Sequence, residues 1–306
     1  MAALNLSECL VIGISSRALF DLEDENNVFT TQGVDAYRQY QRKHEQEVLK
    51  PGSAFYMIQG LLKVNALVKE QHHRAVEVVI MSKNTPDTGL RIFNSIEHYG
   101  LDITRAAFGG GNSLQEYLEA FSVDLFLSKS EEDVQGAIDH GVASALLYDA
   151  PQGYEPVEGQ VRIAFDGDAV LFSEESEKIF KEQGLEAFIK HEKENQDTPL
   201  LEGPFAKLLK TLAFLQKEFP PEDNPFRLAL VTARSSPAHT RVVNTLRAWN
   251  VFLDEAYFLG GVPKDQVLKA FRPHIFFDDQ DLHVQPANKH VPSAKVPYRS
   301  DSSLHG

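Results

Sequence analysis

The sequence predicts an α/β protein built from two Rossmann-like halves, each with a parallel sheet, and a small helical cap in the second half. Three observations lead to this prediction: short apolar runs alternate with helical patterns, the chain matches itself at a fixed offset, and polar residues follow the apolar runs. Continuous apolar strands that alternate with helices are typical of a parallel sheet covered on both faces. Ligands in such folds bind beyond the carboxyl ends of the strands.

The strands are predicted from short runs rich in β-branched and other apolar residues. In the first half these runs are 9–14, 76–81, 105–108, 124–127 and 142–147, and in the second half they are 161–165, 228–231, 256–259 and 274–277. The amphipathic pattern between 173 and 225 predicts the helical cap. Both halves therefore repeat the same kind of strand–helix unit.

An internal duplication is indicated when residues 76–137 are laid over 226–287 without a gap. Thirteen of these 62 positions are identical, and the pair Gly110-Gly111 recurs as Gly260-Gly261. Shared periodicity of two α/β segments is the alternative, but the length of the match favours duplication. We therefore expect a first half at 1–155, a second at 156–285 with its cap at about 173–225, and a flexible tail at 286–306.

Composition narrows the classes of function. The 306 residues carry a net charge of −14, which argues against a nucleic-acid partner but not against a small anionic substrate. Cys9 is the one cysteine, so no disulfide forms within the chain. No apolar run approaches the roughly 20 residues of a membrane span. We expect a soluble cytoplasmic protein without membrane or nucleic-acid partners.

Two acids follow the strand predicted at 161–165. Asp166 and Asp168 can face one pocket if the chain bends at Gly167. One carboxylate would attack phosphorus, and the other would protonate the leaving oxygen and then activate water. This pattern alone is weak, because it also occurs in metal sites of sugar transferases, in calcium loops and on solvated turns.

Further polar residues follow the strand predicted at 228–231. Thr232, Arg234 and Ser235 supply hydroxyls and a cation that suit phosphate oxygens, although a simple helix cap is the alternative. Lys264 stands at the start of a helix, where backbone N–H groups favour an anion, although it also fits an ordinary surface lysine.

The last acidic pair is Asp278-Asp279, which follows the strand predicted at 274–277. Two adjacent acids after a buried run are costly unless they bind a cation or face solvent. Together with Asp166 they would form an oxygen-rich site suited to Mg²⁺.

These motifs occur in the order found in the haloacid-dehalogenase superfamily, and longer strings are more specific. The segments 15–23, 82–91, 95–105 and 165–173 resemble the cytosolic 5′-nucleotidase I family, and the resemblance covers roughly residues 10–283. Lys83 and Thr85 stand where that family has Arg and Ser.

The resemblance implies Mg²⁺-dependent hydrolysis of a nucleoside 5′-monophosphate, AMP or IMP foremost, through an aspartyl-phosphate. By position, Asp166 would be the nucleophile, Asp168 the acid and base with a carbonyl on the metal, and Thr232 and Lys264 the phosphoryl ligands. Asp279 would bind the metal directly with Asp278 as its partner, unless the two exchange roles. A nucleotide activator such as ADP or ATP would also fit the family, and a homo-oligomer is left open.

The first half lacks all of these groups. The alignment puts Ile14 and Ser16 at the positions of Asp166 and Asp168, Ser82 at Thr232, Leu114 at Lys264, and Ser128-Lys129 at Asp278-Asp279. Catalysis is therefore expected in the second half. The first half is either a structural partner or a carrier of substrate or effector contacts through Arg17, Asn84, Asp87 and Arg91.

Two other functions stay open from the sequence. The motifs define phosphoryl chemistry but not the leaving group, so a phosphatase of sugar phosphates is one alternative. A non-catalytic nucleotide-sensing protein is the other, and the complete motif set of the second half argues against it.

Overall fold

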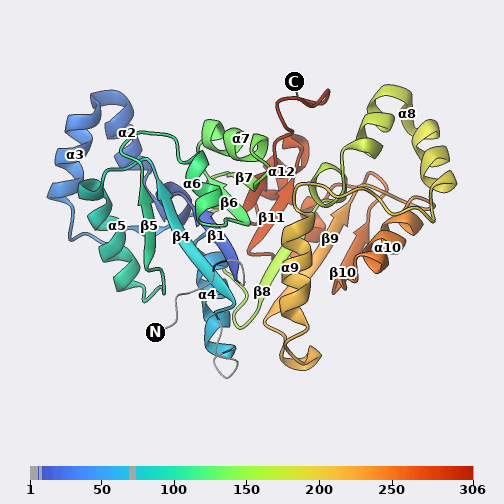
Figure 1. Cartoon of the computed structure of the whole chain (residues 1–306), viewed down its shortest axis with the longest axis horizontal. Coiled ribbons are helices and arrows are strands. Elements are labelled where there is room, and N and C mark those ends of the chain that lie inside the picture. The colour runs from blue at the N-terminus through green and yellow to red at the C-terminus, as the bar shows by residue number, and fades with distance from the viewer. Residues whose placement is uncertain (1–5, 7–8, 69–73, 306) are drawn as a thin grey trace. The chain divides into compact units, whose positions relative to one another are not determined.

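The computed structural model describes residues 6, 9–68 and 74–305. The chain separates into two compact units, Met1–Val142 and Ala143–Gly306. The fold is mixed α/β with mostly parallel strands, as predicted (Figure 1). The division lies earlier than the expected residue 155, because β7 (Ala143–Leu147) pairs antiparallel with β12 (Ser293–Lys295) of the second unit.

The first unit alternates strands and helices along the chain. Its elements are β1 (Leu10–Ile14), α1 (Ser16–Leu19), β2 (Phe20–Asp21), α2 (Glu23–Gln32), α3 (Val34–Lys43), β3 (Lys50–Pro51), α4 (Phe55–Leu67), β4 (Val76–Ser82), α5 (Pro86–His98), β5 (Arg105–Phe108), α6 (Gln115–Ala120), β6 (Leu125–Ser128) and α7 (Glu131–Asp139). Strands β1 and β4 are buried along their whole length, as continuous apolar runs in a covered sheet should be.

The second unit contains the expected helical insertion after its first parallel strand. After β7 come β8 (Val161–Phe165), a π-helical turn (Gly167–Leu171), α8 (Glu175–Glu194), α9 (Ala206–Gln216), a 3₁₀ turn (Pro221–Asp223), β9 (Phe226–Thr232), α10 (His239–Ala248), β10 (Glu255–Phe258), α11 (Asp265–Phe271), β11 (Ile275–Asp278), α12 (Asp281–Ala287) and β12. Helix α8 is interrupted at Gly184, whose φ of +82° lies in the left-handed region that glycine tolerates.

The central strands have the same order in both units. In the first unit it is β6-β1-β4-β5, and in the second it is β11-β8-β9-β10, with β12 and β7 beyond β11. Every neighbouring pair within these two sets of four is parallel. The carboxyl ends of β8, β9 and β11 therefore meet along one edge, where the polar residues of the second unit are found.

All nine strands predicted from sequence are present, with ends shifted by at most two residues. The prediction of a flexible tail at 286–306 is wrong. This stretch completes α12, forms β12 between β11 and β7, and sends the Tyr298 hydroxyl to Asp279. The three-residue strand at Ser293–Lys295 is too short to produce a period in the sequence, and its pairing depends on neighbours distant along the chain.

Each unit has its own hydrophobic core beside its sheet. One buried cluster of the first unit includes Val11, Val79 and Phe126, and one of the second includes Val231 and Phe276. In the described part of the chain, none of the helices combines the length and apolar character that crossing a bilayer requires.

Candidate active site

Three buried carboxylates meet at the carboxyl ends of β8 and β11. Asp166 directly follows β8, Asp278 ends β11, and Asp279 is the next residue; β8 and β11 are paired in parallel. Each carboxylate offers an oxygen that lies within 4.8 Å of the oxygens of the other two. The pairing of two strands distant in the sequence is therefore what creates this acidic cluster.

Lys264 lies against this cluster from the start of α11. Its Nζ is 2.7 Å from Asp166 Oδ1 and 2.7 Å from Asp278 Oδ2, and the residue is 2% exposed. Burial alone would lower the pKa of Lys264, but the two carboxylates outweigh it and raise the pKa above its usual value. Lys264 is therefore a permanent cation beside the candidate nucleophile.

Thr232 ends β9, the strand on the other side of β8, and is almost completely buried. Its hydroxyl accepts a hydrogen bond from the Arg234 backbone N–H at 3.2 Å. A Cβ added at Gly167 would lie 3.3 Å from Thr232 Oγ1, so this side chain lies beside the turn between Asp166 and Asp168. Thr232 can thus offer its O–H to a ligand at the same strand ends.

Asp168 is held by Arg234 in a two-pronged ion pair. Arg234 Nε and Nη2 donate to the two oxygens of Asp168 at 2.8 and 2.6 Å. Arg234 Nη1 donates to Glu192 of α8, which also accepts from Arg241 at 3.0 Å and from Ser176 at 2.9 Å. The Arg234 guanidinium is engaged by carboxylates here, so the structure does not present it as a free phosphate ligand.

A divalent cation fits the residues of the acidic cluster. Asp279 Oδ1 is buried without a hydrogen-bond partner among the described residues, while Oδ2 accepts from the Tyr298 hydroxyl. Burial, opposed by Lys264 and assisted by Asp278, raises the pKa of Asp166 to about 6. Burial and the neighbouring Asp278 and Asp166 also raise the pKa of Asp279 well above its usual range. One lysine does not balance three buried carboxylates, and a hard cation with oxygen ligands would.

The remaining predicted ligands lie elsewhere. Ser235 is exposed in the loop after β9. Arg17, Asn84 and Arg91 belong to the first unit. Arg91 is buried and donates to Glu25 at 2.5 Å, to Gln41 at 3.3 Å and to the backbone carbonyl of Glu47 at 2.9 Å, so its contacts are those of a structural residue.

Sequence reasoning missed two residues that contact the predicted site. Glu192 lies in a segment of α8 with charged neighbours, so nothing marked it as buried. Tyr298 lies in the stretch expected to be a tail. Phe188 of α8 lies against the Arg234 guanidinium, whose central carbon is 5.3 Å from the ring centroid.

Strand pairing corrects the alignment of the two units by one residue. Ile14 pairs with Ile80, and Phe165 pairs with Leu230, which is 150 positions after Ile80. Ile14 therefore corresponds to Phe165, and Ser15 rather than Ile14 stands at the position of Asp166. Counted from the strand end, Arg17 rather than Ser16 stands at the position of Asp168.

The sequence alignment missed this shift because the second unit has one extra residue just after β8. The backbone N–H of Gly52 bonds to Leu19 O, and that of Gly203 bonds to Leu171 O. The two leucines are 152 positions apart, one more than the 151 at the strand, whereas the two glycines are again 151 apart. The extra residue lies in the turn at Gly167–Leu171, where Asp168 is extended and Ala169 has a φ of +60°.

Comparisons with known proteins identify the family of the chain. A family model described as 5′-nucleotidase matches residues 2–303. Human cytosolic 5′-nucleotidase 1B is 39% identical over 288 residues, which are 92% of this chain and 47% of that protein. The chain thus spans about half the length of this curated relative.

A solved structure of a Pnkp1/Rnl/Hen1 complex aligns with 96% of this chain and 98% of the matched chain. Its TM-score is 0.34 at 13% identity, which is too low to carry an argument about fold. The family match extends across both units and includes every residue of the acidic cluster. The chain belongs to the 5′-nucleotidase family.

Proposed function

We propose that this chain is a Mg²⁺-dependent phosphomonoesterase that hydrolyses nucleoside 5′-monophosphates, AMP or IMP foremost, to nucleoside and phosphate. The observation that carries the proposal is the buried group of Asp166, Asp278 and Asp279 with Lys264 at the ends of adjacent parallel strands. Membership of the 5′-nucleotidase family and the name of the human relative support the substrate class.

In the proposed mechanism, an oxygen of Asp166 attacks phosphorus and forms an aspartyl-phosphate while the bond from phosphorus to the 5′ oxygen breaks. Asp168 gives its proton to that oxygen as the nucleoside leaves. Asp168 then takes a proton from the water that attacks phosphorus and releases phosphate from Asp166. Each Asp168 oxygen accepts one hydrogen bond from Arg234 in the structure and keeps a second lone pair for the proton, so Arg234 can orient Asp168 during the transfer.

The remaining groups offset negative charge. Lys264 and the Thr232 hydroxyl would hold phosphoryl oxygens, and the positive charge of Lys264 lets a dianionic ester approach Asp166. Asp166, Asp278, Asp279 and the Asp168 carbonyl would hold Mg²⁺, which when bound neutralises charge on the carboxylates and on the transferring phosphoryl group.

Phosphate release tests this proposal directly. The wild type is assayed with AMP, IMP, pyrimidine monophosphates and sugar phosphates, each with Mg²⁺ and with EDTA. We expect turnover of nucleoside monophosphates in Mg²⁺ and none in EDTA. Asp166→Asn should abolish turnover, whereas Asp197→Asn, at an exposed acid of the same unit, should not. Turnover confined to sugar phosphates would establish the alternative substrate class, and an inactive wild type would favour the sensor function.

We further propose that the two units descend from one ancestral unit, which was copied and then lost its acids in the first copy. An ion pair supports this idea. Glu77 on β4 pairs with Arg105 on β5 at 2.8 Å, and at the corresponding positions Arg227 on β9 pairs with Glu255 on β10 at 2.5 Å. The contact is the same with its charges exchanged, which chance periodicity does not explain.

Two properties suggested by the family resemblance stay predictions. ADP or ATP is predicted to change the rate of AMP turnover, which a titration of either nucleotide against a fixed AMP concentration measures. A cytoplasmic location agrees with the name of the human relative.

A further inference from the structure

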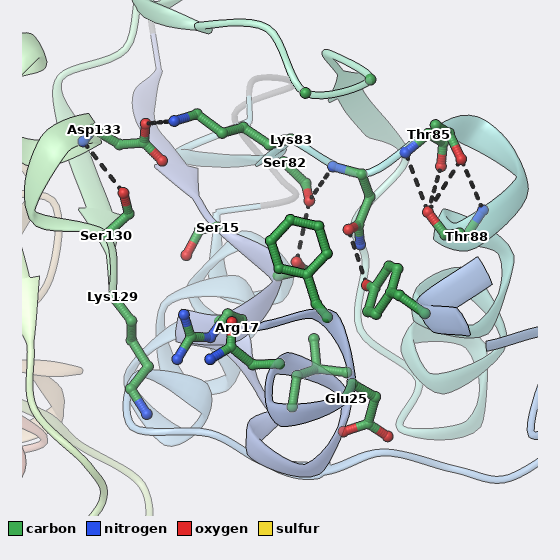
Figure 2. A pocket seen from close by; sticks show the side chains of 18 of the residues that line it. Ser15, Arg17, Glu25, Ser82, Lys83, Thr85, Thr88, Lys129, Ser130 and Asp133 are labelled. Carbon is green, nitrogen blue, oxygen red and sulfur yellow. Dashed lines mark hydrogen bonds and ion pairs between the residues drawn. The ribbon is translucent and has the colours of Figure 1, made fainter. Parts of the chain in front are cut away.

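The first unit contains a cavity of about 520 Å³ at the carboxyl ends of β1, β4 and β6. Three serine hydroxyls line it at these strand ends: Ser15, Ser82 and Ser128. Its volume is that of a site for a small organic molecule. Figure 2 shows Ser15, Arg17 and Ser82 around this pocket, with Lys83 extended toward Asp133.

Basic side chains outnumber acidic ones in the lining, although the whole chain carries a net charge of −14. The basic side chains among the lining residues are Arg17, Arg38, Lys83 and Lys129, and the acidic ones are Glu25 and Asp133. Both acids are engaged, Glu25 by Arg91 at 2.5 Å and Asp133 by Lys83 at 2.7 Å. The four basic side chains also have acidic partners: Arg38 pairs with Asp35 at 3.3 Å, Lys83 pairs with Glu132 at 3.1 Å, and Arg17 and Lys129 share Glu23 at 3.1 and 2.6 Å. Because one carboxylate serves both Arg17 and Lys129, this pair keeps one positive charge that Glu23 does not offset.

Corresponding positions of the two units show how this charge arises. With the corrected register, Arg17 stands at the position of Asp168, and Lys129 stands at the position of Asp279. Serines occupy the positions of Asp166 and Asp278. Where the second unit has carboxylates that could hold a cation, the first unit has two cations and two neutral hydroxyls, which are groups able to bind a phosphate without a metal.

Two buried donors of the pocket residues have no acceptor within the described part of the chain. Arg17 Nε and Asn84 Nδ2 are buried and make no hydrogen bond among the described residues, although Arg17 also pairs with Glu23 and Asn84 accepts from Tyr37. Buried polar groups normally find partners, so unmatched donors here point to a ligand that supplies acceptor oxygens.

The other side of the cavity is apolar and aromatic. Leu22, Phe29 and Val34 line it, and Phe29 is 46% exposed. The Tyr37 ring meets Phe29 edge to face, with 5.8 Å between centroids. An exposed aromatic face beside a basic pocket suits a ligand with a planar ring and an anionic group.

We propose that the first unit binds an aromatic phosphate ester in this pocket, without a divalent cation and without hydrolysing it. The phosphate lies against Arg17, Lys129 and the serine hydroxyls, and the ring lies against Phe29. Hydrolysis does not follow, because no carboxylate stands at the nucleophile position, which Ser15 occupies. This site is separate from the proposed catalytic cluster and does not depend on its activity.

Calorimetric titration in EDTA tests this proposal on the full chain carrying Asp166→Asn, which prevents turnover. The probes are AMP, phenyl phosphate, inorganic phosphate and adenosine. We expect AMP and phenyl phosphate to bind in EDTA, and inorganic phosphate and adenosine to bind more weakly. Arg17→Met and Lys129→Met, each added to this background, should weaken AMP binding roughly 10-fold or more, since each removes a charged ligand of the phosphate.

Lys43→Met, at an exposed position on α3, is the matched control and should leave the affinity unchanged. Thermal unfolding of each variant establishes that it is folded. Binding that is absent, that requires Mg²⁺, or that is unaffected by both Arg17→Met and Lys129→Met overturns the proposal. So does adenosine or inorganic phosphate binding as tightly as AMP. A loss of wild-type turnover with this binding intact would instead count against the proposed function alone.

Discussion

At the scale of single residues, the candidate site is a balance of buried charge. Lys264 neutralises part of the charge of Asp166 and Asp278, and Asp279 keeps one buried oxygen without a partner among the described residues. In metal sites, the groups that hydrogen-bond to the ligands fix the orientation of those ligands. Tyr298 is the residue whose contact with Asp279 makes that idea testable.

Tyr298→Phe should weaken Mg²⁺ activation of phosphate release roughly 10-fold, because Asp279 loses the O–H that orients it, while kcat at saturating Mg²⁺ changes little. The measurement is phosphate release as a function of Mg²⁺ concentration. Tyr154→Phe, which removes a 2.9 Å hydrogen bond to the Pro273 carbonyl in the same unit, is the matched control and should leave the Mg²⁺ curve in place. An unchanged curve for Tyr298→Phe would show that the tyrosine does not orient the ligand.

A second residue-scale prediction concerns His274, which is buried and accepts the Arg162 backbone N–H at Nδ1 at 3.1 Å. Burial, with Arg162 nearby, lowers the pKa of His274 to about 4. The unfolded chain therefore binds a proton between about pH 6.5 and 4 that the folded chain does not. Stability is full above pH 6.5 and should fall by about 3 kcal/mol as the pH drops to 4.

Urea unfolding at a series of pH values measures this loss. His274→Asn keeps an acceptor near the position of Nδ1 but does not titrate, so its stability should fall less over the same window. His305→Asn, at an exposed histidine, serves as the control and should follow the wild type. Equal slopes for wild type and His274→Asn would mean that other groups dominate the acid response.

At the scale of elements, α8 is connected to the candidate acid Asp168 through Glu192 and Arg234. The first unit has a related arrangement at the corresponding positions, but there the carboxylate that pairs with the arginine comes from a different one of these positions. There Arg91 binds Glu25 and Gln41, and in the second unit Arg241 binds Glu192, which accepts from Ser176. Glu25 corresponds to Ser176, and Gln41 corresponds to Glu192.

Glu192→Gln should destabilise the chain by about 3 kcal/mol, because two buried arginines lose the carboxylate they share. Adding Ser176→Glu recreates the arrangement of the first unit and should recover a substantial part of this loss. Urea unfolding of the single and double variants measures both effects. Glu194→Gln, at an exposed position of the same helix, is the control. A double variant less stable than Glu192→Gln alone would show that the two arrangements are not interchangeable.

The sequence was sufficient for elements whose signal is local. Continuous apolar runs such as Val161–Phe165 identify parallel strands, and acids directly after them identify the strand ends that meet. Features that depend on partners distant in the sequence could not be predicted from local patterns. Strand β12 exists because β11 and β7 flank it, and Glu192 is buried because Arg234 and Arg241 converge on it. The extra residue near Ala169 was not visible in the sequence. The two units match well after this point, and the same alignment was continued back to the strand without a gap.

At the scale of the whole molecule, the two units use one strand order for sites of opposite charge. The second unit places acids at the strand ends that could hold a cation, whereas the first places Arg17 and Lys129 there. Charge, rather than fold, would therefore separate the ligands that we propose for the two units. Mg²⁺ added alone should therefore stabilise the second unit, and AMP added without Mg²⁺ should stabilise the first.

Hydrogen exchange followed by mass spectrometry should resolve this division. Mg²⁺ compared with EDTA should slow amide exchange at the ends of β8 and β11, where the Asp166 N–H bonds to Phe277 O and the Gln280 N–H bonds to Asp278 Oδ1, and should leave residues 9–68 and 74–142 unchanged. At a Mg²⁺ concentration about 100 times its Kd, amides that exchange by unfolding of the site should slow by roughly 100-fold. Asp279→Asn should lose this protection, because it removes a ligand of the cation.

In the Asp166→Asn chain, AMP in EDTA should instead slow exchange around 15–17 and 128–130. Mg²⁺ protection at those first-unit segments would contradict the division, because it would place a cation where the structure has Arg17 and Lys129.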